Sequence, residues 1–505
     1  MSAEAAVLAI DQGTTGTTAM VVTRTGSILG QSYAEFTQHF PRPGWVEHDA
    51  MEIWEVTRRV SREALGIVAG KARVEGIGIT NQRETVVVWD RETLEPVHRA
   101  IVWQDRRTTE ICRELKAAGH EEDLRRRTGL LFDPYFSGTK LTWLFRERPE
   151  LRRRAEAGEL AAGTVDSWLL ARLSGGAVHR TDHTNASRTL FYNLATRGWD
   201  PRLLEMLEIP ERILPEIVSS SGELAPVRSG ALDVEAPVAG VAGDQQAALF
   251  GQGCWSRGLA KNTYGTGAFL LLHTGQEPVV SDYGLLTTMA CDERGGPAYA
   301  LEGSIFVAGA AVQWLRDGLG ILSEAGESET LAGRVPSNEG VYFVPAFVGL
   351  GAPHWDPEAR GTLVGLTRGT TRAHLARAAL EAMAYSTGDV LRAMERDSGV
   401  ETRELRVDGG AAMNDWLMQF QAGILAVPVR RPAVVETTAL GAAGLAGLAT
   451  GVWENASDFL GAAGEATVFA PDMAREDRRV HWKGWRRALA TARAWAAWEE
   501  EEGSP

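Results

Sequence analysis

Short apolar segments alternate with polar turns from the start of the chain. Residues 7–10 (VLAI) and 19–22 (AMVV) are apolar, and the Gly/Thr-rich stretch 11–18 separates them. Two apolar runs joined by a turn of glycine and threonine are typical of a β-hairpin. The same pattern returns almost halfway along the chain, in residues 259–272 (LAKNTYGTGAFLLL). We therefore expect a similar hairpin to open each half of the chain.

A helix and two more strands follow the first hairpin. Asp49 and Glu52 have capping-box spacing, which predicts a helix that begins near Asp49. One face of this helix is apolar, with Ile53, Val56, Val60 and Ala64. Residues 74–79 and 85–89 predict two strands that flank the polar turn 81–84. Because strands and helices keep alternating along the chain, we expect an α/β fold.

The length of the chain predicts two domains. A chain of 505 residues exceeds the size of one compact core. The hairpin pattern restarts after residues 251–253, so we place the domains at 1–252 and 253–505. Two related lobes that face each other leave a cleft, and ligands favour such interfaces. The Ala/Gly-rich stretch 439–450 is too short to span a bilayer and predicts a buried helix with close backbone contacts.

Charge and cysteine content narrow the functional classes. The formal net charge is -14, which disfavours a nucleic-acid-binding protein because such proteins need a basic surface. Cys112, Cys254 and Cys291 lie far apart and form neither a CxxC pair nor a disulfide framework. This usage indicates a reducing cytoplasm. The first residues lack the charged start and apolar core of a signal peptide, and we expect no contact with a membrane.

Two Gly/Thr turns are the best candidates for binding phosphate. The sequence has no GxxxxGK[ST] motif and no GxGxxG between a strand and a helix, which excludes a P-loop and disfavours a dinucleotide site. Turns 13–17 and 263–267 offer backbone N–H groups and threonine hydroxyls to a phosphate. One such turn is more often an ordinary hairpin, but two that open the two halves favour phosphate clamps on facing lobes. Asp11 precedes the first turn and is either a holder of Mg²⁺ through water or a turn-forming residue.

Small residues in the second half have two interpretations. Gly409 and Gly410 follow an apolar strand, and Asn414 precedes a helical pattern, which indicates close approach of a backbone or ligand. Residues 307–311 (VAGAA) begin another helix, which continues through Gln313. The small side chains leave room for an adenine, or they permit tight packing of helices, which we favour on this pattern alone.

A polar group in the first half is the candidate substrate site. Asp244 follows the apolar strand that ends at residue 242, where a carboxylate can accept a proton from an attacking hydroxyl; capping of the next helix is the alternative. Arg83 and Glu84 share a turn and suit the hydroxyls of a ligand, or they form a surface ion pair. Trp103 and Tyr135 are large aromatic residues in polar loops, where a core role is less natural.

Taken together, these motifs resemble the FGGY carbohydrate kinase family over essentially the whole chain, and within it the branch that phosphorylates glycerol. The resemblance implies two ribonuclease H-like domains of the actin-like ATPase type, with an active-site cleft between them. It is carried by AIDQGTTGT (9–17), PGWVEHDAMEIW (43–54), GITNQRET (78–85), DPYFSGTK (133–140), AGDQQAALFGQ (242–252), NTYGTG (262–267), WLRD (314–317), PAFVGLGAPHWDPEARG (345–361) and VDGGAAMND (407–415).

The resemblance also implies a role for each matching position. Asp244 is the expected general base, and Asp11 is expected to hold the hydration shell of Mg²⁺. The polyol is expected to contact Arg83, Glu84, Trp103, Tyr135, Gln245 and Phe269. The residues expected around ATP are Thr14, Thr15, Gly16, Thr266, Gly309, Gln313, Gly410 and Asn414.

The implied activity is transfer of the γ-phosphoryl group of MgATP to glycerol by a cytoplasmic homo-oligomer, a dimer or tetramer. A kinase for xylulose, ribulose or gluconate is the nearest alternative, and a non-kinase ATPase like actin or Hsp70 is a remote one. Many members of the glycerol branch have an arginine that approaches the phosphates where this chain has Thr18. The loop 222–237 is shorter than the loop with which some bacterial members bind fructose 1,6-bisphosphate, so we expect no such regulation.

Overall fold

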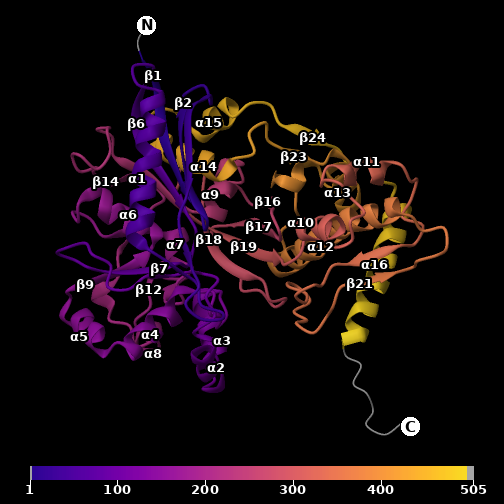
Figure 1. Ribbon diagram of the computed structural model, residues 1–505, viewed down its shortest axis with the longest axis horizontal. Helices are drawn as coiled ribbons and strands as arrows, with labels where there is room; N and C mark the ends of the chain where they lie inside the picture. Colours follow the sequence, from indigo (N-terminus) through magenta and orange to yellow (C-terminus); the bar gives the residue numbers. More distant parts are fainter. Residues whose placement is uncertain (1–2, 497–505) are drawn as a thin grey trace.

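The computed structural model describes residues 3–496 and has two lobes, each built around a large β-sheet (Figure 1). The sheet of the first lobe has six strands in the order β14-β15-β6-β1-β2-β3, and that of the second lobe has seven, in the order β18-β19-β17-β16-β22-β23-β24. A five-stranded sheet, β4-β5-β8-β7-β9, extends the first lobe. The α/β class and the two hairpins that open the halves are thus confirmed.

The two large sheets repeat one topology. In the first sheet, β1, β2 and β3 are antiparallel, and β6 and β15 then run parallel to β1. In the second sheet, β16, β17 and β19 are antiparallel, and β22 and β23 run parallel to β16. Three antiparallel strands followed by two parallel ones are the ribonuclease H-like arrangement. Each sheet adds edge strands to this core.

The strands of the first lobe have the following bounds: β1 Glu4–Gln12, β2 Gly16–Thr23, β3 Ile28–Glu35, β4 Gln38–His39, β5 Glu47–His48, β6 Ala72–Asn81, β7 Val86–Asp90, β8 Ala100–Ile101, β9 Leu160–Thr164, β10 Arg180–Asp182, β11 Tyr192–Asn193, β12 Gly198–Trp199, β13 Glu216–Val218, β14 Ser221–Ala225 and β15 Val238–Gly243. Those of the second are β16 Leu259–Tyr264, β17 Ala268–Gly275, β18 Leu286–Cys291, β19 Pro297–Ile305, β20 Tyr342–Val344, β21 Thr362–Val364, β22 Glu404–Gly409, β23 Val429–Arg431 and β24 Thr467–Phe469.

The helices have the bounds α1 Ala50–Ile67, α2 Thr109–Ala117, α3 Glu121–Thr128, α4 Ser137–Glu147, α5 Pro149–Ala157, α6 Val165–Ser174, α7 His183–Ala186, α8 Pro201–Met206, α9 Asp244–Gly251, α10 Gly309–Gln313, α11 Glu327–Gly333, α12 Arg372–Ser398, α13 Asp415–Leu425, α14 Thr437–Ala449, α15 Ala456–Ala462 and α16 Arg475–Ala496. None of the helices within residues 3–496 is both long and apolar enough to cross a membrane.

Helix α1 begins as predicted but without a complete capping box. The Asp49 carboxylate accepts hydrogen bonds from the N–H groups of Met51 and Glu52 and so caps the helix. The Glu52 side chain turns instead to Thr37 and accepts from both its N–H and its hydroxyl. The spacing therefore predicted the start of the helix, whereas the tertiary contact decided the partner of Glu52.

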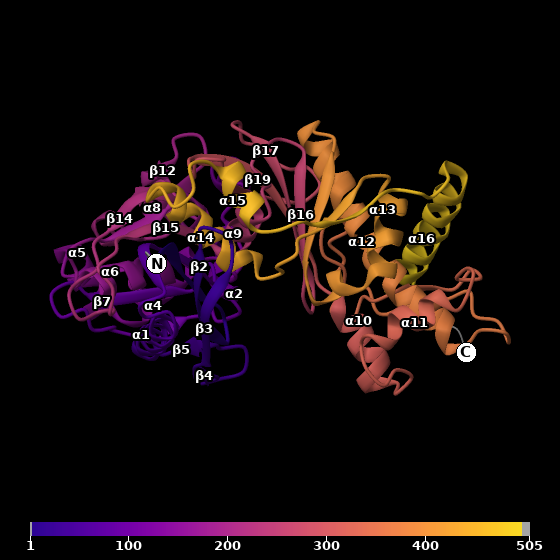
Figure 2. The ribbon, with the colours of Figure 1, turned by 90° about the horizontal axis from the view of Figure 1, so that it is seen from above.

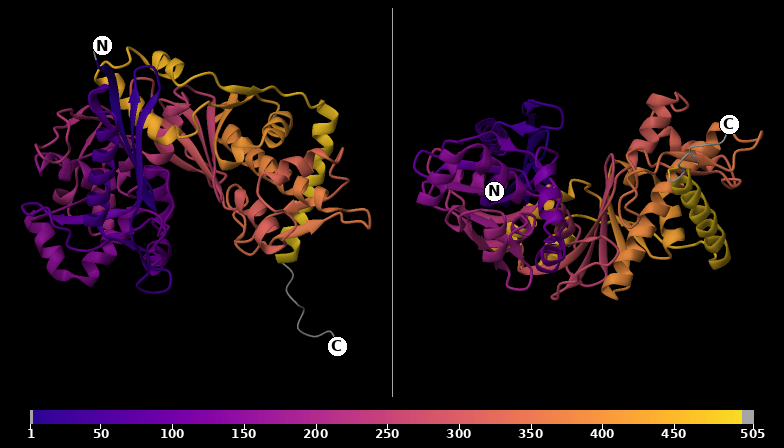
Figure 3. Two further views of the ribbon diagram at one scale, coloured as in Figure 1. Left: turned by 45° about the horizontal axis from the view of Figure 1, so that its top comes forward. Right: turned by 90° about the horizontal axis from the view of Figure 1, so that it is seen from below.

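Helix α14 belongs to the second half of the sequence but packs on the sheet of the first lobe. Figure 3 shows it beside the N-terminal strands, while Figure 2 shows α12, α13 and α16 on the far side of the second sheet. The helix makes extensive contacts with α9, β6, β15 and β1. The carbonyl oxygen of Ala442 lies 2.0 Å from the point a Cβ would occupy at Gly78, and that of Ala247 lies 1.9 Å from the same point at Gly441. The prediction of a buried helix with close backbone contacts is confirmed.

The close contact at Gly441 generates a stability prediction. Gly441→Ala forces apart the backbones of α14 and α9, so we expect its free energy of unfolding to fall by about 3 kcal/mol. Gly66→Ala is the matched control, because Gly66 is exposed near the end of α1 and a Cβ there meets nothing within 4 Å. This control gains helix propensity and should change stability by less than about 1 kcal/mol. Denaturant unfolding of both variants measures the difference, and an unaltered Gly441→Ala would contradict the packing.

Candidate active site

Three parallel strands of the first sheet end together and present the candidate site. In the register of β1, β6 and β15, Gln12 pairs with Asn81, and Asn81 pairs with Gly243. Asp11, Arg83 and Asp244 lie at or just beyond these strand ends. Parallel strands place their carboxyl ends at one edge of a sheet, where ligands of α/β proteins bind. The sequence-predicted acids and Arg83 are thus brought together.

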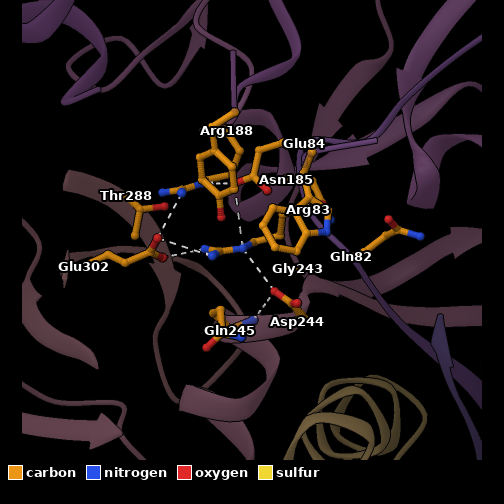
Figure 4. A network of polar contacts seen from close by, with 12 residues as sticks. Gln82, Arg83, Glu84, Asn185, Arg188, Gly243, Asp244, Gln245, Thr288 and Glu302 are labelled. Carbon is orange, nitrogen blue, oxygen red and sulfur yellow. Dashed lines mark hydrogen bonds and ion pairs between the residues drawn. The ribbon is translucent and has the colours of Figure 1, made fainter. Parts of the chain in front are cut away.

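Arg83 connects the candidate base to the second lobe (Figure 4). Its Nε lies 3.0 Å from Oδ1 of Asp244, and its Nη1 donates to Glu302 over 2.5 Å. The Arg83 side chain is 2% exposed, whereas that of Asp244 is 34% exposed. The surface ion pair considered for Arg83 is therefore wrong. The guanidinium is buried and leaves the Asp244 carboxylate as the accessible member of the pair.

Glu84 lies at a strained turn and faces a second arginine. Its φ of 60° is in the left-handed region, which costs energy for a residue with a side chain. Arg188 donates to Oε1 of Glu84 over 2.6 Å and to Oε1 of Glu302 over 2.9 Å. Burial raises the pKa of Glu84, and the arginines oppose that rise. The strained backbone aims this carboxylate at the other charges.

Arg188 and Glu302 were not predicted as site residues from the sequence. Glu302 lies in the middle of β19, is 1% exposed and accepts from both arginines. Burial opposes its charge, but Arg188 and Arg83 overcome this and lower the pKa of Glu302 to about 2. The signal available in the sequence was a glutamate inside the apolar strand 297–305 (PAYALEGSI). A charge in that setting needs a partner, but the sequence does not say which.

The aromatic residues of the predicted site pack edge to face. The rings of Trp103 and Tyr135 have centroids 5.7 Å apart, and Nε1 of Trp103 donates to the hydroxyl of Thr14 over 2.9 Å. The Arg188 guanidinium lies 5.6 Å from the centroid of Tyr135. The fully buried ammonium of Lys140 donates to the carbonyls of residues 134, 135 and 136, which fixes the loop that carries Tyr135. Trp103 therefore joins the first Gly/Thr turn to the polar cluster.

Asp11 and Asp244 form an acidic pair. Burial, and then the negative charge of Asp244, raises the pKa of Asp11 to about 7. Among residues 3–496 no group of three or more His, Cys, Asp or Glu side chains is arranged to hold a metal ion. Mg²⁺ commonly uses one or two carboxylates together with water and phosphate oxygens. The residues present fit a hydrated Mg²⁺ beside Asp11, because a cation there would relieve the repulsion between the carboxylates of Asp11 and Asp244.

The first Gly/Thr turn is a tight turn at the tip of the β1–β2 hairpin. The N–H of Gly13 donates to the carbonyl of Gly16 over 2.9 Å. Thr15 is exposed, Thr14 is half-buried and Gly16 is buried. A Cβ at Gly16 would lie 2.7 Å from the carbonyl oxygen of Ala34, so the position requires glycine. Thr18, the departure noted above, lies directly opposite Asp11 in the hairpin.

The second Gly/Thr turn repeats this geometry and is backed by α10. The N–H of Gly265 donates to Gly267 over 2.8 Å, and the carbonyl of Thr266 accepts from the N–H groups of Ala308 and Ala310. A Cβ at Gly309 would lie 2.6 Å from the carbonyl oxygen of Gly265. Gly309 therefore packs closely against the turn, and no larger side chain fits there. Thr266 itself is exposed, as is Gln313 at the end of α10.

The remaining nucleotide-side residues follow β22, the parallel neighbour of β16. Tyr264 pairs with Gly409, so the turn at 265–267 and the glycines at 409–410 lie at adjacent strand ends. Gly409 has a φ of 82° and sits against the backbone of Tyr264. Gly410 is exposed, and the side chain of Asn414 accepts from Leu417 N–H as the cap of α13. The structure thus places Thr266, Gly309 and Gly410 around one edge, with Asn414 engaged as a helix cap.

One face of the second sheet turns toward the polar cluster. Cross-strand partners share a face, and the register pairs Lys261 with Leu271 and Leu271 with Glu302. Thr263 pairs with both Phe269 and Asp408, so these residues share the face of Glu302. Phe269 is half-buried there. Gln245 reaches this face from α9 through Lys261.

The network around Glu302 generates a second stability prediction. Glu302→Gln keeps the shape but leaves two buried arginines with too little negative charge, so we expect a loss of about 3–5 kcal/mol. Adding Arg188→Met removes one of those charges. The loss of stability in the double variant should therefore be smaller than the sum of the two single losses by at least about 1 kcal/mol. Denaturant unfolding of the four proteins in this cycle measures the coupling, and additive effects would contradict it.

Comparison with known proteins assigns the chain to a family. Profiles described as the N-terminal and C-terminal domains of the FGGY family of carbohydrate kinases match residues 6–251 and 260–450. A protein of Dechloromonas aromatica named glycerol kinase is 57% identical over 97% of this chain and 98% of its own length. One of Deinococcus radiodurans with the same name is 55% identical, over 98% and 99%.

A solved structure shares the whole architecture. Plasmodium falciparum glycerol kinase with ADP superposes with a TM-score of 0.93, at 35% identity, over 97% of this chain and 98% of that one. The family profiles and the full-length similarity agree with the paired ribonuclease H-like sheets. The chain belongs to the FGGY family of carbohydrate kinases.

Proposed function

We propose that this chain is a glycerol kinase, which transfers the γ-phosphoryl group of MgATP to glycerol and yields sn-glycerol 3-phosphate and ADP. The observation that carries the proposal is the accessible carboxylate of Asp244, held among otherwise buried charges. The relatives described above bear this name over nearly their full length. Both lines of support point to the same reaction.

Asp244 is the proposed general base. A bond forms between a terminal oxygen of glycerol and the γ-phosphorus, and the bond from that phosphorus to the β–γ bridging oxygen breaks. The hydroxyl proton passes to the Asp244 carboxylate. Its Oδ1 accepts from the N–H of Gln245 over 2.7 Å and lies beside Nε of Arg83, which orients the carboxylate. An oriented acceptor within hydrogen-bond reach is what such a step requires.

The polyol site proposed here has one polar and one apolar side. Arg83 and Glu84 offer donors and acceptors to hydroxyls, and Tyr135 adds a hydroxyl of its own. Trp103 and Phe269 offer aromatic surface to the carbon chain. Glycerol has three hydroxyls on a short hydrocarbon backbone, and it matches such a pocket. Glu302 holds the guanidinium of Arg83, and Arg188 holds the carboxylate of Glu84 and also pairs with Glu302.

The nucleotide is proposed to bind between the two Gly/Thr turns. Thr14, Thr15 and Gly16 contact the phosphates from the first lobe, and Thr266 contacts them from the second. Gly309, Gln313, Gly410 and Asn414 line the rest of the nucleotide site. A Mg²⁺ ion near Asp11 would supply neutralisation of phosphate charge, which is a large part of phosphoryl-transfer catalysis. Exclusion of water by closure of the lobes prevents hydrolysis.

Location and assembly are proposed from the cysteines and from exposed apolar side chains. Cys112, Cys254 and Cys291 are free and buried, which suits a reducing cytoplasm. Large apolar side chains within residues 347–366 are exposed, and they suit an interface in a homo-oligomer, a dimer or tetramer: Phe347, Val348, Trp355 and Leu366.

A substrate panel separates glycerol from other FGGY substrates. We expect ADP release with glycerol to exceed that with xylulose, ribulose or gluconate by at least about tenfold in kcat/KM, because longer polyols bring hydroxyls against Trp103 and Phe269. A coupled ADP-release assay at equal substrate concentrations measures this. A higher kcat/KM for xylulose, ribulose or gluconate than for glycerol would contradict the proposal and indicate that compound as the substrate. ADP release without any acceptor or phosphorylated product would favour an actin- or Hsp70-like ATPase.

Asp244→Asn tests the role of the base. The amide keeps the size of the side chain but cannot take up the proton, so kcat should fall about 100- to 10,000-fold. Nucleotide binding, measured by calorimetry, should change less than about threefold because the turns are intact. Asp477→Asn, on the exposed first turn of α16, is the matched control. A variant that keeps more than a tenth of the wild-type kcat would rule out Asp244 as base.

A further inference from the structure

Lys261 is a buried ammonium for which the mechanism above has no use. It lies in the middle of β16, whose sequence LAKNTY contains both apolar and polar residues, and its side chain is fully buried. Its Nζ donates to the hydroxyl of Thr263 over 2.9 Å and to Oε1 of Gln245 in a short contact. Burying an ammonium is costly unless its partners compensate. Its partner Gln245 directly follows the candidate base Asp244, so the contact lies beside the proposed reacting groups.

Helix α9 rests on the second sheet through polar contacts at both of its ends. At its first turn, Gln245 contacts Lys261 of β16. At its other end, Nε2 of Gln252, the residue that caps the helix, donates to Oδ2 of Asp408 on β22 over 2.9 Å. Asp408 also accepts from the hydroxyl of Thr437, the first residue of α14. The two strands that carry the second phosphate turn and the 409–410 glycines therefore also hold the helix that begins with Asp244.

The chemistry of an ammonium fixes the amide of Gln245. An ammonium has three donors and no acceptor, so only the amide oxygen can face it. The Nε2 of Gln245 is consequently left free to donate, and among residues 3–496 no protein group accepts from it. A neutral amine can both donate and accept, so it would permit either orientation of the amide. The charge on Lys261 is thus what selects one orientation.

We propose that Lys261 is a positioning residue, whose ammonium fixes the Gln245 amide with Nε2 available to the reacting oxygens and ties Asp244 to the strand of the second phosphate turn. This rests on the proposed phosphoryl transfer, in which Gln245 and Asp244 meet the acceptor. Lys261 itself acts only through them.

The charges around Lys261 make the effect sensitive to pH. Asp408 of β22 and Asp244 of α9 favour the ammonium, as does Glu302 of β19, whereas Arg83 disfavours it. The thiol of Cys254, also near, stays neutral because burial raises its pKa to about 12. Burial outweighs the acids and lowers the pKa of Lys261 to about 8. As pH rises through that value the charge is lost, so the selected orientation should be lost on the alkaline side.

A double-mutant cycle tests the path through Gln245. Lys261→Met removes the charge while keeping an unbranched apolar stem, and we expect kcat/KM for glycerol to fall at least about tenfold, the usual scale for a hydrogen bond to a charged group. In a Gln245→Ala background the same substitution should change kcat/KM less than about threefold, because its target is absent. Equal effects in both backgrounds, or an unaltered Lys261→Met enzyme, would overturn the proposal.

A pH profile keeps the test decisive if Lys261→Met fails to fold. Lys261→Arg retains a permanent charge, so its kcat/KM should hold above pH 8, where that of the wild type declines. The same alkaline decline in both proteins would overturn the proposal. Lys483→Met, on the exposed surface of α16, is the matched control and should keep the kcat/KM and the pH profile of the wild type. Wild-type turnover of glycerol is measured first, which separates failure of the proposed function from failure of the role of Lys261.

Discussion

Burial of opposite charges between the two lobes is the constraint on which the site depends. Glu302 of the second sheet lies between Arg83 and Arg188 of the first lobe, and Arg188 continues the chain to Glu84. Buried charges of this kind add little net stability compared with apolar packing, but they enforce one arrangement because any other leaves a charge unpaired. The accessible carboxylate of Asp244 stands at the end of this chain of charges. Its position is therefore set by both lobes together.

The repeated topology explains why the two halves can share one site. Each sheet has parallel strands that end at the same edge, and each carries a Gly/Thr hairpin turn there. The first edge presents acids and an arginine, whereas the second presents exposed backbone and a threonine. Helix α14 comes from the second half of the sequence but packs on the first sheet, through close backbone contacts at glycines that leave no room for a Cβ. The two lobes are thus joined by a covalent crossover as well as by the ion pairs.

Local features of this molecule were predictable from the sequence, and long-range partners were not. The hairpins, the start of α1 and the buried α14 follow from periodicity, a cap and small residues, all of which act within a few positions. Arg188, Glu302 and Lys261 went unnoticed because each is a single charge in a strand or loop, and its partner comes from distant sequence. Glu52 was misassigned for the same reason, since its true partner Thr37 lies outside the helix. The catalytic and binding roles drawn from the family resemblance remain predictions for the individual residues.

The most direct test of the account is a crystal structure of this chain with glycerol and a non-hydrolysable ATP analogue. We predict a terminal hydroxyl of glycerol within about 3 Å of the Asp244 carboxylate and turned toward the γ-phosphate. Arg83 and Glu84 should contact the other hydroxyls, and the two Gly/Thr turns should lie on either side of the phosphates. A closed complex in which the Asp244 carboxylate is remote from every hydroxyl would contradict it.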